Sequence, residues 1–231
     1  GPGLDERGLA SIGKLKNLKR LTARVTTIRG LNRLNGLSNL EQLQISPGDA
    51  PIETASSREI SLDLSGLGKM KDLNLDGLPL RDDDIASLKH MTSLERLRIA
   101  PANPLTGKAL QHLGGLTELD TLIIGPLSNC TGGDMAHWNG LTQLTELIVG
   151  GEIADAALAS SAGPPRLKSL SVETNVPIRR ETANDLAARL PSLEYIRITE
   201  PFSPASRPAN ASGGSVRIHR QSPTTTPPAR R

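Results

Sequence analysis

One phrase of three apolar anchor positions recurs along the first two hundred residues, with polar residues between the anchors. The first two anchors are three residues apart, and the last two are two residues apart. The copies read KNLKRLTA, SNLEQLQI, GKMKDLNL, TSLERLRI, TELDTLII, TQLTELIV, PRLKSLSV and PSLEYIRI. Their first anchors follow one another at intervals of 22, 30, 24, 25, 25, 23 and 26 residues. This period predicts a repeat architecture with one structural unit per phrase.

Two hydrophobic periodicities alternate within each unit. The second and third anchors have the two-residue spacing of a strand, so each phrase predicts a short parallel strand. Upstream, apolar residues lie three, six and nine places before the first anchor, a step that indicates an α-helical or 3₁₀ return. The clearest examples are Ile85, Leu88 and Met91, then Leu110, Leu113 and Leu116, then Met135, Trp138 and Leu141. Such a unit buries its apolar side only by stacking on its neighbours.

The LxxLxL phrases resemble those of the leucine-rich-repeat superfamily over about residues 9–200. The first units resemble the short internalin-type repeat, and later ones such as LTGKALQHLGGLTELDTLII resemble bacterial repeats with a longer helical side. The resemblance implies an α/β fold: a curved right-handed solenoid with parallel strands on the concave face and short helices on the convex face. It also implies that the concave face holds a protein partner.

Three segments depart from the repeat. Residues 1–3, Gly-Pro-Gly, are interpreted as the scar of a cleaved tag, and the chain as a fragment of a longer protein. The repeat domain is predicted over residues 4–200, in about eight repeats, with an insertion near 46–66 whose ISLDL stretch has the pattern of a strand. Residues 201–231 form a tail rich in Pro and Arg, in which a capping strand is predicted at 215–220.

The charge of the chain is distributed unevenly. Residues 201–231 contain five arginines and no acid, which leaves 22 Lys+Arg against 24 Asp+Glu in residues 1–200. The net charge of +3 is therefore a property of the tail, and a nucleic-acid contact is expected only there. No apolar run approaches the roughly 18 residues of a membrane span. The single cysteine excludes an intramolecular disulfide and favours a reducing, cytoplasmic location.

Candidate chemistry is sparse. No GxxxxGK[ST] loop or other catalytic motif occurs, so we expect neither enzyme activity nor a cofactor. His112 and His137 occupy equivalent places in successive units, but no cysteine or carboxylate completes a zinc set, and both are expected to face solvent. Cys130 is interpreted as a buried structural residue and Trp138 as part of the core. The run 82–84, three aspartates, suits a helix N-terminus.

The residues flanking the second anchor of each phrase point away from the core and form the predicted binding face. Ile123 and Ile148 are expected to lie side by side, about 4.8 Å apart, as an apolar spot on a polar surface. The alternative is that isoleucine occurs there only because it suits strands. The predicted partner-binding residues are Arg96, Arg98, Thr121, Ile123, Glu146, Ile148, Ser171, Tyr195 and Arg197.

The sequence therefore predicts a protein-recognition module. One version is the C-terminal ligand-sensing part of a larger intracellular protein, for example a NACHT/STAND-type NTPase of bacterial innate immunity. A second is the substrate-recruiting part of an effector enzyme such as a ubiquitin ligase, and a third is a nucleic-acid contact through the basic tail. Both the NACHT/STAND version and the ligase version rest on analogy between folds.

Overall fold

The computed structural model describes residues 3–49, 52, 61–199 and 216–219. The strands are β1 (Arg20–Val25), β2 (Gln42–Pro47), β3 (Asp72–Asn74), β4 (Arg96–Ile99), β5 (Leu105–Thr106), β6 (Thr121–Cys130), β7 (Glu146–Ile153), β8 (Ser169–Thr174), β9 (Tyr195–Thr199) and β10 (Val216–His219). The α-helices are α1 (Glu6–Ile12), α2 (Asp82–Ile85), α3 (Gly132–Met135), α4 (Asp155–Ser160) and α5 (Arg180–Arg189). The 3₁₀ helices are η1 (Arg29–Leu34), η3 (Ala86–His90), η4 (Gly107–His112) and η5 (Ala136–Gly140).

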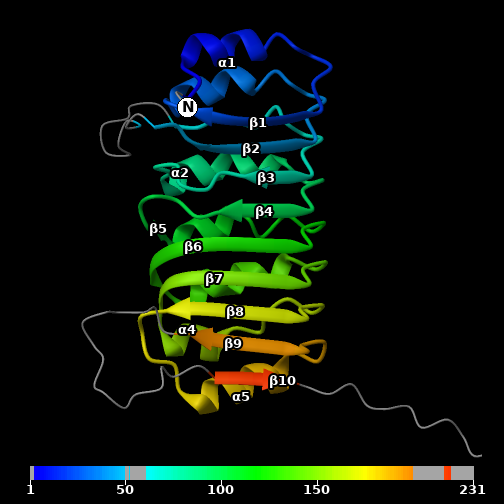
Figure 1. Ribbon diagram of the computed structural model, residues 1–231. Coiled ribbons are helices and arrows are strands. Elements are labelled where there is room, and N and C mark those ends of the chain that lie inside the picture. Colours follow the sequence, from blue (N-terminus) through cyan, green and yellow to red (C-terminus); the bar gives the residue numbers. More distant parts are fainter. Residues whose placement is uncertain (1–2, 50–51, 53–60, 200–215, 220–231) are drawn as a thin grey trace, which may run out of the picture.

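All the strands belong to one open sheet. Its order is β1-β2-β3-β4-β6-β7-β8-β9-β10, and the short β5 pairs with β6. Every pairing is parallel except that of β10 with β9. Figure 1 shows the strands stacked in chain order, with the helices gathered on one side of the sheet. Each of the eight phrases forms one of the parallel strands, so the predicted solenoid is confirmed.

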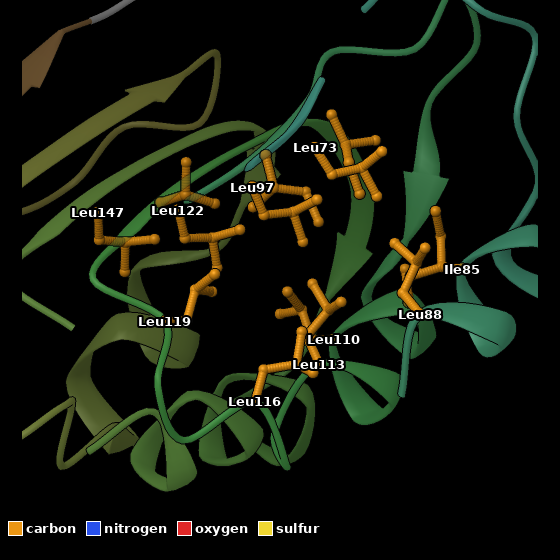
Figure 2. Packing of buried hydrophobic residues seen from close by; sticks show 14 of the residues in the cluster. Leu73, Ile85, Leu88, Leu97, Leu110, Leu113, Leu116, Leu119, Leu122 and Leu147 are labelled. Carbon is orange, nitrogen blue, oxygen red and sulfur yellow. The ribbon is translucent and has the colours of Figure 1, made fainter. Parts of the chain in front are cut away.

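The core lies between the sheet and the helical side. Leu73, Leu97, Leu122 and Leu147 are second anchors from consecutive units, and each is at most 1% exposed. Figure 2 shows them pointing toward side chains of the helical side, among them Ile85, Leu88, Leu110, Leu113 and Leu116. The three-residue step predicted for the return segment is confirmed, because a 3₁₀ helix places residues three apart on one side. Each leucine layer is therefore closed by its neighbours above and below.

Several return helices begin with a side-chain cap. Thr131 begins α3: its Oγ1 accepts a hydrogen bond from the backbone N–H of Asp134, and the Asp134 carboxylate accepts one from the Thr131 N–H at 2.9 Å. Asp84 satisfies the start of α2 by accepting from Arg81 N–H at 2.7 Å. Asp82, at the start of the same helix, accepts from Thr106 N–H of the next unit at 2.8 Å. The prediction that the aspartate run begins a helix is confirmed, and Asp82 also joins two units.

The strand predicted for ISLDL is wrong for the described residues of that stretch. Residues 61–64 form no strand and lie on the helical side. Asn32 of η1 holds them there: its Nδ2 donates to the Ser61 carbonyl at 3.1 Å and its Oδ1 accepts from Asp63 N–H at 2.8 Å. Leu62 and Leu64 are both buried. The segment is thus the extended return of the third unit, while residues 50, 51 and 53–60 of the predicted insertion lie outside the described residues.

Segments outside the eight phrases pair with both terminal repeat strands of the sheet. At the β1 edge, Leu4 forms a parallel bridge with Val25 and donates a hydrogen bond to the Arg24 carbonyl at 2.6 Å. At the other edge, β10 pairs antiparallel with β9 and lies inside the range 215–220 predicted for a capping strand. The rest of the tail, residues 201–215 and 220–231, lies outside the described residues.

Candidate partner-binding site

The side of the sheet away from the helices, here called the strand face, carries two rows of outward side chains. The sheet register aligns Arg96, Thr121, Glu146, Ser169 and Tyr195 in the first row, and Arg98, Ile123, Ile148, Ser171 and Arg197 in the second. All nine predicted partner-binding residues fall in these rows, and Ser169 is the additional member. The register therefore brings the predicted set together on one continuous surface.

Ile123 and Ile148 are direct register partners on β6 and β7, as the spacing of the phrases predicted. Both are half-buried, unlike the second-anchor leucines beneath them. They line a depression of about 540 Å³ in the strand face. Its other lining residues are Arg98, Ala100, Ile124, Gly125, Pro126, Gly150, Gly151, Glu173 and Asn175. The apolar spot is thus the floor of a hollow.

The hollow exists because the positions beyond the two isoleucines have almost no side chains. Ala100, Gly125 and Gly150 follow the third anchors of β4, β6 and β7. Gly125 has φ +144°, and a Cβ there would lie 2.7 Å from the Gly150 carbonyl oxygen, so only glycine fits. A Cβ on Gly150 would instead lie 3.6 Å from the nearest atom, the Glu173 carbonyl oxygen. The depth of the depression therefore depends on Gly150, because a side chain would fit at this position and glycine has none.

Charge around the depression is compensated on one side only. Arg98 pairs with Asp76, and Arg96 pairs with Asp72 at 3.0 Å, so each arginine is matched by an acid of the preceding unit. Glu173 lines the depression from β8, and Glu146 lies two residues before Ile148. Both glutamates are exposed, and neither side chain has a hydrogen bond or ion pair within the described ranges. Of the two charged residues that line the depression, Arg98 thus has an acidic partner, and Glu173 has none in the described ranges.

Sequence reasoning missed Gly150, Glu173 and Asn175. They lie beyond the third anchor, where the phrases end but β7 and β8 continue, to Ile153 and Thr174. A signal was present, because LIIGP and LIVGG place glycine directly after the third anchor in two successive units. Repeated glycine at one register position indicates close backbone approach.

Comparisons with known proteins agree with this architecture. No protein-family model and no curated protein matches the chain. A crystal structure of an internalin from Listeria monocytogenes matches it with a TM-score of 0.56 and 22% sequence identity over 81% of this chain. The chain has the leucine-rich-repeat fold. The match covers 50% of the internalin chain, so this leucine-rich-repeat chain spans about half the length of that protein.

Other reactive side chains of the leucine-rich-repeat domain do not line the strand-face depression. Cys130 is 4% exposed, and burial together with the nearby Asp134 raises the pKa of its thiol to about 12, which makes it a poor nucleophile. His137 is exposed, whereas His112 is half-buried rather than facing solvent fully as predicted. Across residues 3–49, 61–199 and the other described positions, no group of three or more His, Cys, Asp or Glu is placed to hold a metal ion.

Trp138 of the leucine-rich-repeat core is 4% exposed, which confirms its predicted place, and its indole N–H donates to the buried Ser161 hydroxyl. Within the part of the chain that the structure describes, no helix is long and apolar enough to cross a membrane.

Proposed function

We propose that this leucine-rich-repeat domain recognises a protein partner through the strand face centred on Ile123 and Ile148. The main support for this proposal is the depression of about 540 Å³, whose floor is this half-buried isoleucine pair. Arginines and glutamates surround it, which gives the apolar centre and polar rim of a protein interface. The helices of the described residues lie on the other side of the sheet and leave this surface uncovered (Figure 1). Binding, rather than catalysis, is the activity that such a surface supports.

The experiment is affinity capture with wild type and with the double variant Ile123→Asp/Ile148→Asp. Because both side chains are half-exposed and point away from the leucine core, the variant should keep the thermal midpoint of wild type and lose the partner. The matched control is Thr22→Asp/Gln44→Asp, which adds the same two charges to the same row on β1 and β2. Retention of the partner by the isoleucine variant would refute the proposal.

A second proposal concerns the protein to which this domain belongs. We place the domain in the cytoplasm as the ligand-sensing part of a larger protein, with a NACHT/STAND-type immune NTPase of bacteria as the leading version. Its support is the resemblance of the later units to bacterial repeats. Substrate recruitment for an enzyme such as a ubiquitin ligase is the alternative. A nucleotide-binding domain or a ligase domain in the parent open reading frame distinguishes the two.

A nucleic-acid contact through the tail is a separate candidate, favoured only by the five arginines and absence of acids in residues 201–231. It predicts DNA or RNA binding that weakens steeply as salt rises and that disappears when residues 201–231 are deleted.

A further inference from the structure

The depression on the strand face is large enough to admit a side chain together with the backbone that carries it. Its volume of about 540 Å³ lies within the roughly 300–1,000 Å³ of typical ligand pockets. Ile123 and Ile148 form the floor, and Gly150 leaves the space beside them unfilled. A flat β surface would offer only the tops of side chains. Here an apolar group can descend to the level of the backbone.

The charged residues next to this space determine which side chain of the partner can lie beside the apolar group. Glu173 is aligned with Gly150 in the register, so its carboxylate stands at the wall of the depression. Arg98, at the opposite wall, is bonded to Asp76. Arg197 on β9 is aligned with Ser171, whereas Glu173 is aligned with Thr199. No ion pair joins Glu173 to either arginine in the described ranges, so Glu173 is available to a cation from outside.

The register also sets the spacing between the two features. Glu173 lies one strand across from Gly150, which is two residues along from Ile148. With about 4.8 Å between strands and about 3.3 Å per residue, Ile148 and Glu173 are roughly 8 Å apart at the backbone. An extended peptide advances about 3.3–3.6 Å per residue. A long cationic side chain one or two residues from the apolar one therefore covers this span.

We infer that the partner is a peptide segment in which a large aliphatic or aromatic side chain lies one or two residues from a lysine or arginine. The apolar side chain occupies the depression over Ile123 and Ile148, and the cation contacts Glu173, with Glu146 adding to the negative potential. This inference rests on the proposed function and states the chemistry of its partner.

The test measures binding of capped synthetic octapeptides to the full chain by fluorescence anisotropy. Three peptide sets contain a central Phe or Leu and differ only two residues later, where they carry Lys, Glu or Ser. Wild type should bind the Lys set most tightly and the Glu set most weakly. Glu173→Gln should reduce the advantage of Lys over Ser by about threefold, the scale of an exposed charge contact. Higher salt should reduce the same advantage.

Two further variants make the test specific. Glu118→Gln removes an equal charge from an exposed turn before β6, and it should leave the ranking of the peptides unchanged. Gly150→Val fills the depression where a Cβ meets only ordinary contacts, so it should weaken all three sets at least tenfold while the thermal midpoint is kept.

The outcomes separate this inference from the proposed function. If all three sets bind equally well, or Glu173→Gln weakens all sets alike, the cationic part of the inference is overturned while the isoleucine surface stands. If no set binds although Ile123→Asp/Ile148→Asp still abolishes affinity capture, the peptide inference is overturned and the proposed function survives. If peptides bind the isoleucine variant as well as they bind wild type, both are overturned.

Discussion

Gly150 and Gly151 are adjacent in β7, yet substitution by alanine should have opposite effects on stability. Gly150 has ordinary strand geometry, and an added Cβ would lie 3.6 Å from the Glu173 carbonyl oxygen, an ordinary contact. Gly151 has φ +120°, a conformation that L-residues rarely adopt. An added Cβ there would overlap the backbone nitrogen and oxygen of Leu127 on β6. The opposite effects come from the backbone conformation and its neighbours, because both substitutions add the same methyl group.

The magnitudes follow from these two environments. Alanine at Gly150 should stabilise the domain by about 0.5–1 kcal/mol, because glycine inside a strand costs that much in conformational entropy. Alanine at Gly151 should cost about 1–3 kcal/mol for the disfavoured φ and about 1–3 kcal/mol for moving the Leu127 backbone. The expected free-energy difference between the two variants is therefore about 2.5–7 kcal/mol. That is a large part of the roughly 5–15 kcal/mol of a typical domain.

Urea unfolding followed by far-ultraviolet circular dichroism measures this difference. Both variants remove one glycine from one strand and add one methyl group, so each serves as the composition control of the other. We expect the midpoint of Gly150→Ala at or above that of wild type and the midpoint of Gly151→Ala well below it. Unfolding free energies that agree to within about 0.5 kcal/mol would show that β6 and β7 do not approach as closely as described.

Three further predictions concern single side chains. Alkylation of Cys130 by iodoacetamide at pH 8 should be roughly a thousandfold slower in the folded chain than in urea, because burial raises the thiol pKa to about 12; similar rates would contradict its burial. Burial raises the pKa of Asp155, but hydrogen bonds from Thr182 and Arg179 outweigh burial and hold this pKa below its ordinary value. The carboxylate should therefore stabilise the fold above about pH 4 and stop doing so as pH falls further, and Asp155→Asn should flatten that acid limb in urea midpoints measured from pH 6 to 2.5. Trp138→Phe should lower the free energy of unfolding by about 1–3 kcal/mol, because the Ser161 hydroxyl loses its donor. A double-mutant cycle with Ser161→Ala should show that the two residues share this loss.

The fold was predictable because its determinants are periodic. Each unit repeats the same apolar spacing, and equivalent positions such as Leu97 and Leu122 are buried in one continuous cluster. The strand predicted for ISLDL is wrong because residues of other units determine the conformation of this stretch. Alternating Leu62 and Leu64 would suit a strand, but the side chains of Asn32 and Asp84 bind the backbone of this segment on the helical side. Such tertiary hydrogen bonds leave no trace in local periodicity.

The candidate site was predictable in part for the same reason. The alignment of Ile123 with Ile148 follows from the 25-residue period, so the apolar spot could be placed in advance. The depression could not, because it depends on how far β7 and β8 extend beyond the last anchor, which the phrases do not show. The compensation of Arg98 depends on Asp76, which lies outside the repeated phrase altogether.

The extended return of the third unit has a consequence for cooperativity. Residues 61–64 have no helix of their own, and their backbone is held by Asn32 of the unit before and Asp84 of the unit after. In a linear array, the interface with the weakest coupling determines where the molecule opens. We expect native-state hydrogen exchange to differ on the two sides of this unit. The backbone amides of β1 and β2 should exchange together, and those of β4 to β8 should exchange together more slowly. The surface around Ile123 would then stay folded while the first two units open and close.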